Sequence, residues 1–125
     1  MHDKDKLIEY LRKNVSVEVT AEEEDMPIRG NACAIDEETD KAMEDRIIAD
    51  YNSGNIWAWC CVKVTVSTAY FKGVSYLGGC SYESGKDFVE NSGYYQDMVD
   101  EALSDMADDI IKHHHFTSEM ARLVV

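Results

Sequence analysis

Apolar residues recur every three or four positions between residues 93 and 111, and this pattern constrains the fold more than any other feature of the 125-residue chain. The stripe consists of Tyr95, Met98, Val99, Ala102, Leu103, Met106, Ile110 and Ile111. Acidic residues lie mostly around it, at Asp97, Asp100, Glu101, Asp105, Asp108 and Asp109. The period predicts one long amphipathic helix. Because such a stripe must be buried, the helix needs a second layer to pack against.

The most apolar run, residues 55–66, predicts a strand in that layer. Its sequence, NIWAWCCVKVTV, gives both faces of a strand apolar side chains. One face holds Ala58, Cys60, Val62, Val64 and Val66, and the other holds Trp57, Trp59, Cys61, Lys63, Thr65 and Ser67. We expect the valine face to form the core beneath the long helix. A second strand follows after a turn marked by Gly73, and the connection is too short for a parallel crossover, so the two form a hairpin.

The first third of the chain predicts a helix, a strand and a second helix. Residues 3–14 place Leu7, Ile8 and Leu11 on one helical stripe. Residues 15–20 alternate, which predicts a half-buried strand with the three valines Val15, Val17 and Val19 facing inward. A helix capped by Asp36 then follows, with Gly54 suited to the left-handed position after its end. Its apolar positions are Met43, Ile47, Ile48 and Tyr51.

The predicted order is helix, strand, helix, strand, strand, helix, in a single domain spanning residues 1–125. We expect an α+β fold in which a small antiparallel sheet of about three strands includes the hairpin 55–82. The long C-terminal helix and one or two further helices pack on this sheet. His113, His114 and His115 are expected to end the long helix and to complement its negative C-terminal dipole. The tail FTSEMARLVV is apolar enough to dock rather than extend into solvent.

The charge balance limits the partners of the chain. Its 25 acidic and 12 basic residues give a net charge of −13, which repels nucleic acid and anionic membranes and favours a basic partner. No apolar run approaches the roughly 18 residues that a membrane helix needs. The four cysteines form no CxxC pair and follow no secretory leader, so we expect free thiols in a reducing cytoplasm.

No motif predicts a catalytic, metal or cofactor site. The segment GGCSYESGKD has five residues between Gly79 and Gly85, and Asp87 follows Lys86, so it does not match a phosphate-binding loop. We expect Gly78 and Gly79 to mark a bulge or a close backbone approach under an aromatic ring. The three successive histidines point about 100° apart on a helix and cannot converge on one metal ion. No cysteine has a local histidine to act as its base.

Two groups of residues are candidates for a binding surface. Trp57 and Trp59 are covered by the first helix or, if they are open, form an interface hot spot that includes homodimerisation. The acids of the 22–25 loop and of the long helix are either solvated or act together as rows of carboxylates that imitate a phosphate backbone. These acids are Glu22, Glu23, Glu24, Asp25, Asp97, Asp100, Glu101 and Asp105.

Four stretches, EDMPIRGNACA, NIWAWCCVKVTV, YLGGCSY and GYYQDMVDEAL, together resemble a family of small acidic proteins carried by bacteriophages and prophages. The likeness covers about residues 18–107. The family has no assigned activity, so the resemblance implies no catalytic or binding residues. It implies a viral or mobile-element origin and expression in the cytoplasm of a bacterial host. Small acidic phage proteins of this size are often accessory factors that inhibit host restriction or CRISPR systems.

We therefore expect a non-enzymatic phage accessory protein that acts through an acidic surface on a host nucleic-acid-handling or defence protein. An alternative is a small-ligand-binding protein or enzyme that uses the Gly78–Gly79 turn, Cys80 and the surface of Trp57 and Trp59. A pocket lined by both tryptophans, Tyr76 and Cys80 would favour that alternative. A further alternative is a component of the virion or of its assembly.

Overall fold

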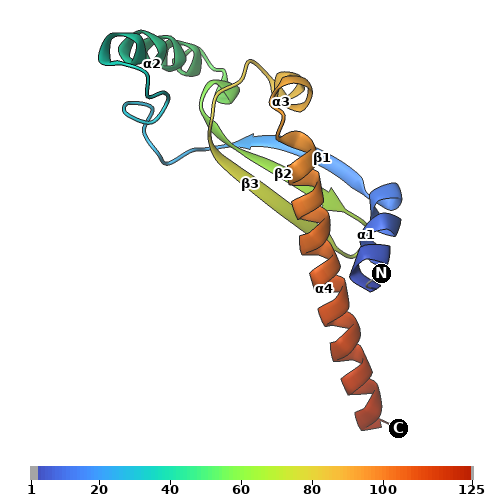
Figure 1. The fold of residues 1–125 in the computed structure, drawn as a ribbon. Helices are drawn as coiled ribbons and strands as arrows, with labels where there is room; N and C mark the ends of the chain where they lie inside the picture. Colours follow the sequence, from blue (N-terminus) through green and yellow to red (C-terminus); the bar gives the residue numbers. More distant parts are fainter. Residues whose placement is uncertain (1–2, 125) are drawn as a thin grey trace. The chain divides into compact units, whose positions relative to one another are not determined.

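A computed structural model describes residues 3–124 and confirms the α+β class. The elements in chain order are α1 (Asp3–Asn14), β1 (Ser16–Glu22), α2 (Glu37–Asn52), a short 3-10 helix η1 (Ile56–Ala58), β2 (Cys60–Ser67), β3 (Lys72–Cys80), α3 (Gly85–Asn91) and α4 (Tyr95–Val124). The strands form one antiparallel sheet in the order β1-β2-β3, so β2 is central (Figure 1). The predicted hairpin and the predicted long helix are both confirmed.

The chain divides into two compact units according to its internal contacts, and we describe each unit separately. The first, called here the α1–α4 unit, consists of the chain up to Glu18, residues Val64–Ser75 and the chain from Asp97 onward. The second, the α2–α3 unit, consists of Val19–Lys63 and Tyr76–Gln96. Each strand of the sheet therefore contributes residues to both units. The expectation of a single domain remains a prediction.

The core of the α1–α4 unit confirms the expected pairing of the valine face with the long helix. Val64 and Val66 of β2 are fully buried, as are Ala102, Leu103, Met106 and Ala107 of α4. Gly73 lies within β3 rather than at the turn, which residues 68–71 form with the Thr68 amide donating to the Phe71 carbonyl at 2.9 Å. A Cβ at Gly73 would lie 1.9 Å from the Ala102 carbonyl oxygen. Glycine is therefore required there because β3 and α4 are in backbone contact.

Two expectations for this unit are wrong in part. Val17 was expected to face inward with Val15 and Val19, but it is 41% exposed while those two are half-buried. The histidines do not end α4, which continues to Val124 and runs past the β2–β3 hairpin (Figure 1). The residues after His115 include no glycine or proline, so nothing in the sequence stops the helix there.

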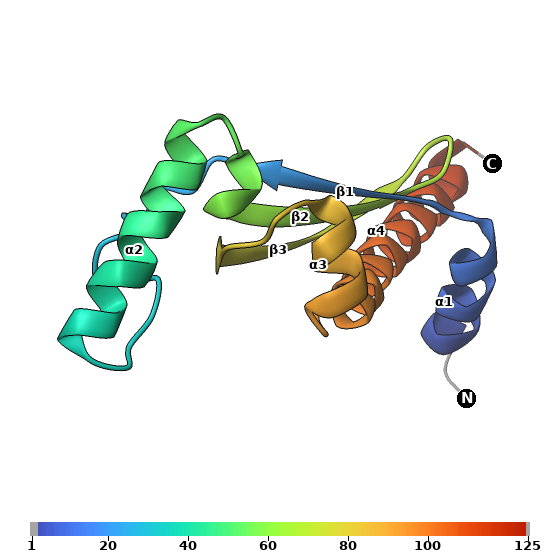
Figure 2. The same cartoon turned by 90° about the horizontal axis from the view of Figure 1, so that it is seen from above.

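In the α2–α3 unit, the caps of α2 are confirmed but its apolar face is not buried. The Asp36 carboxylate accepts the Thr39 amide at 2.7 Å, and Gly54 has the expected positive φ of 108°. The one buried residue of α2 is Glu44, whereas Met43 and Tyr51 are each 37% exposed. Figure 2 shows α2 beside η1. Among the described helices, none is both long and apolar enough to cross a membrane.

Candidate binding groove

The two tryptophans lie outside β2, the strand in which the alternation placed them. They belong to η1 and to the residue that follows it, because the Asn55 side chain caps the turn by accepting the Trp57 amide at 3.1 Å. β2 begins only at Cys60, so Trp57 of η1 lies outside the strand, while Trp59 directly precedes it with extended backbone (φ −155°, ψ 114°). Strand alternation was therefore extended too far towards the N-terminus. From Cys60 onward the even-numbered residues are buried as expected.

Both tryptophans are covered, but by segments of the α2–α3 unit. Trp59 is 4% exposed and its indole N–H donates to the Met26 carbonyl at 2.7 Å. Trp57 is half-buried, with its ring centroid 6.3 Å from that of Phe88 of α3. The expected alternatives were cover by the first helix or an open surface, whereas the contacts of Trp59 are with Met26 and Gly79 and those of Trp57 with Phe88. Trp59 is consequently not an exposed hot spot.

The acidic loop 22–25 is partly engaged in contacts of its own unit. One Glu24 carboxylate oxygen accepts a very short hydrogen bond from the Gly79 amide, and a Cβ at Gly78 would lie 2.8 Å from the same oxygen. Gly79 has a φ of 64° and lies against Trp59, which confirms the predicted close approach at these glycines under an aromatic ring. Glu22 pairs with Lys63 at 3.6 Å. The exposed acids of residues 22–25 are Glu22, Glu23 and Asp25.

Three of the four candidate acids of α4 bind groups within the α1–α4 unit. Asp100 pairs with Arg12 of α1 at 2.7 Å, and a second pair joins Lys4 to Asp108 at 2.9 Å. Two further acids bind β3: Glu101 accepts the Ser75 hydroxyl at 2.7 Å, and Asp105 accepts the Val74 amide at 3.1 Å. Asp97 is exposed. These carboxylates hold α1 and β3 against α4, a role that amphipathic spacing alone does not reveal.

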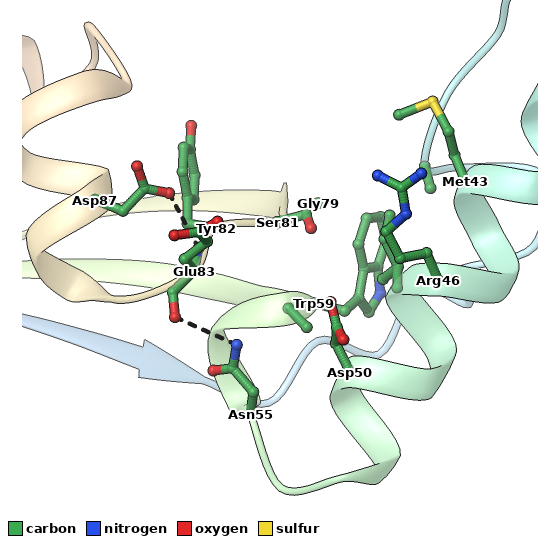
Figure 3. Close-up of a pocket in the computed structure, with 13 residues that line it drawn as sticks. Met43, Arg46, Asp50, Asn55, Trp59, Gly79, Ser81, Tyr82, Glu83 and Asp87 are labelled. Carbon is green, nitrogen blue, oxygen red and sulfur yellow. Dashed lines mark hydrogen bonds between the residues drawn. The ribbon is translucent and has the colours of Figure 1, made fainter.

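A groove of about 490 Å³ lies between α2 and the segment that joins β3 to α3, entirely within the α2–α3 unit. Figure 3 shows Met43, Arg46 and Asp50 projecting from α2, with Trp59 beside them. On the other side lie Ser81, Tyr82, Glu83 and Asp87, as the same view shows. The remaining lining residues are Ala32, Ile47, Asn55, Ala58 and Gly79. Of the residues proposed from the sequence as interface candidates, this groove contains Trp59 alone.

The rim of the groove is predominantly acidic. Asp50, Glu83 and Asp87 face a single cation, Arg46, which forms no ion pair with any described residue. The Glu83 amide and the Asn91 side chain donate to Asp87 and lower its pKa, so this carboxylate is ionised at neutral pH. Its position is fixed by the same hydrogen bonds. The groove thus combines apolar lining residues with fixed negative charge.

A buried carboxylate holds the α2 wall of the groove. Glu44 accepts the Gly30 amide at 2.8 Å and the Arg29 guanidinium at 3.2 Å. Arg29 also donates to Asp45 at 2.5 Å, and these two hydrogen bonds raise its pKa. The loop 23–36 is therefore attached to α2 by polar contacts rather than by apolar packing. A helix attached in this way keeps apolar side chains at its surface.

The four cysteines are free thiols, and none has the environment of a nucleophile. Burial raises the pKa of Cys60 to about 12 and raises the pKa of Cys61 and Cys80 as well. The Cys33 thiol donates to Asp40 at 2.8 Å, and this bond raises its pKa. All four thiols are therefore protonated at neutral pH, whereas a nucleophilic cysteine needs a lowered pKa.

A second cavity of about 220 Å³ is lined by residues 77–82 and Tyr94, and thus contains Gly78, Gly79 and Cys80. The pocket expected for a ligand-binding protein also needed Trp57, Trp59 and Tyr76. These residues do not come together with Cys80 in either cavity. Within residues 3–124, no group of three or more histidines, cysteines, aspartates or glutamates is placed to hold a metal ion.

Comparison of the chain with protein-family models, with curated proteins and with solved structures finds no match. The groove is therefore interpreted from its own geometry. Sequence reasoning missed Arg46, Asp50, Glu83 and Asp87 because they come from two segments with no shared motif. One signal could have indicated them. Met43, Ile47 and Tyr51 repeat at helical spacing on a helix that is otherwise strongly polar, which is typical of a surface that is only partly covered.

Proposed function

We propose that this protein is a non-enzymatic phage accessory protein that binds a basic segment of a host protein through the α2 groove. The observation that carries the proposal is the groove itself, in which Met43, Ile47 and Trp59 lie beside the acidic rim of Asp50, Glu83 and Asp87. Apolar contact supplies affinity, and the acidic rim selects a segment that presents lysine or arginine. The net charge of −13 accelerates association with such a partner.

The host partner would be a nucleic-acid-handling or defence protein in the bacterial cytoplasm, since such proteins expose basic surfaces. This part of the proposal rests on the resemblance to phage proteins and on the charge. The mode of binding differs from the sequence expectation, in which rows of carboxylates from residues 22–25 and from α4 imitated a phosphate backbone. Asp100, Glu101 and Asp105 are engaged within their own unit, so the groove rim is the better candidate for the acidic surface. The raised thiol pKa values support a role without cysteine catalysis.

Titration with short fluorescent peptides tests this function. An amphipathic peptide with lysines and leucines should bind, while a peptide in which glutamate replaces each lysine should not. Binding should weaken steeply with salt, because the rim charges are exposed to screening. Replacing Asp50 by lysine should weaken binding about tenfold, whereas Asp109→Lys on α4 changes the net charge equally and should have little effect. Equal effects of the two substitutions would contradict a groove-specific site.

The host partner can be identified with a photo-crosslinking residue at position 43 in the groove and a control at exposed Lys13. We expect a bacterial protein crosslinked from position 43 only, with lysine or arginine at the crosslinked segment. Crosslinking of the same protein from both positions, or of acidic proteins alone, would contradict the proposal.

A further inference from the structure

The last part of α4 presents an apolar stripe that no described part of the chain covers. From Lys112 to Leu123 no side chain is buried. Phe116, Met120 and Leu123 are 63%, 45% and 77% exposed, and their spacing places them on one face of the helix. The predicted docking of this tail is therefore not seen over these residues. A continuous apolar face on an exposed helix is typical of an interaction site.

The same segment differs in charge from the rest of α4. Between Tyr95 and Ile111 the helix carries six acidic residues and no lysine or arginine, at Asp97, Asp100, Glu101, Asp105, Asp108 and Asp109. From Lys112 onward it carries Lys112, three histidines and Arg122, with Glu119 as the one acid. With its histidines neutral, the end of α4 is an amphipathic helix of net charge +1 in a chain of net charge −13, and its Arg122 pairs with Glu119 at 3.2 Å on the exposed surface.

The groove of the α2–α3 unit has the complementary properties. It offers Met43, Ile47 and Trp59 to apolar side chains, and its rim carries Asp50, Glu83 and Asp87. Its volume of about 490 Å³ is within the usual range of pockets that enclose a ligand, so it can receive large apolar side chains from a helix. Because the end of α4 is already helical, docking it orders little additional chain.

We propose that the end of α4, residues 112–124, of one copy docks in the α2 groove of a second copy. This inference rests on the groove of the proposed function and names one occupant for it. The contact joins two different surfaces, so repetition produces a closed ring or an open chain of copies rather than a symmetric pair. A host segment would then compete with the end of α4 for the same groove.

A mixing experiment tests this arrangement. The tail variant combines Phe116→Asp with Leu123→Asp, and the groove variant combines Met43→Lys with Asp50→Lys. Circular dichroism and urea titration first show that both variants are folded as the full chain is. In low salt the full chain should associate with increasing concentration, while each variant alone should sediment as a monomer. An equal mixture should form a one-to-one dimer, because one intact tail and one intact groove remain.

Two other association results overturn the inference. If the full chain stays monomeric at all concentrations, the proposed contact between two copies is excluded. This result would include the case in which the tail binds the groove of its own chain. Association of the groove variant alone, with no dimer in the mixture, indicates symmetric pairing of α4 ends.

A peptide of residues 112–124 should bind the tail variant, and Arg122→Glu in the peptide should weaken this binding about tenfold. Binding of the lysine–leucine probe without a mixed dimer would retain the proposed function and exclude the inference, and the reverse result would exclude the function.

Discussion

The two longest helices of this protein, α4 and α2, are held by different chemistry. The first part of α4 buries Leu103 and Met106 completely and touches the β3 backbone at Gly73. In contrast, α2 buries one carboxylate, Glu44, and keeps Met43 and Tyr51 partly exposed. Apolar packing buries the apolar face of a helix, whereas attachment through polar contacts leaves that face partly exposed to solvent. Residues 98–107 of α4 therefore form part of the core, while α2 keeps apolar side chains available for the binding proposed above.

The largest effect is expected at Gly73, where helix and strand meet. Gly73→Val would place a Cβ 1.9 Å from the Ala102 carbonyl oxygen, and neither backbone can move away without opening the core. We expect a loss of more than about 4 kcal/mol in the free energy of unfolding, measured by urea denaturation. Gly54→Ala is the control, since nothing lies within 4 Å of its Cβ and only the positive φ adds strain. Similar losses for the two variants would show that backbone contact does not hold α4.

Truncation of one apolar residue on each helix distinguishes attachment by apolar packing from attachment by polar contacts. Leu103→Ala leaves a cavity in a fully buried site and should cost about 3 kcal/mol. Ile47→Ala on α2 removes a half-buried side chain and should cost about 1 kcal/mol or less. The free energy of unfolding of both variants, measured in parallel, checks the difference. An Ile47→Ala loss as large as that of Leu103→Ala would mean that α2 also depends on apolar packing.

Removal of the carboxylate that attaches α2 should have an intermediate effect. Glu44→Ala leaves the Gly30 amide and one donor of Arg29 without their acceptor, and we expect a loss of about 2 kcal/mol. Asp45→Ala removes the more exposed acceptor of Arg29 and should change stability by less than about 0.5 kcal/mol. Amide exchange of Gly30 should rise in the first variant and not in the second. Equal exchange in both would contradict the role of Glu44.

The smallest effect concerns pH and the one thiol whose pKa is most strongly raised. Burial raises the Cys60 pKa from its ordinary value of 9.0 to about 12. Because the folded state favours the protonated thiol, stability is full below about pH 9 and falls as the pH rises towards 12. Cys60→Ala should therefore show a shallower loss of stability than the unmodified chain between about pH 8 and pH 10.5. Identical slopes would show that the thiol is not desolvated.

The sequence predicted the parts of this fold that follow from local pattern. The 3.6-residue period located α4, alternation located the buried face of β2, and Asp36 with Gly54 located the ends of α2. These signals act over a few residues and need no knowledge of distant contacts. The end of α4 was misplaced because histidines are compatible with a helix interior as well as with a helix end.

The candidate site was less predictable, because it is made of contacts between segments distant in the sequence. Strand alternation was extended over Trp57, which lies outside the strand because the Asn55 cap starts η1 before β2 begins. The acids of α4 were correctly expected around the apolar stripe, but spacing cannot distinguish a solvated carboxylate from one that binds an amide of β3. Glu24 is the clearest example, because its partner Gly79 lies 55 residues away.

The raised pKa values of all four cysteines have a practical consequence for site-specific labelling. Their thiols are protonated at neutral pH, so each should react slowly with maleimides. A single cysteine introduced at Tyr70, which is 91% exposed, would react much faster. The chain can therefore carry one fluorophore without prior removal of its own cysteines, and the same holds for Leu123 when the end of α4 itself is to be observed.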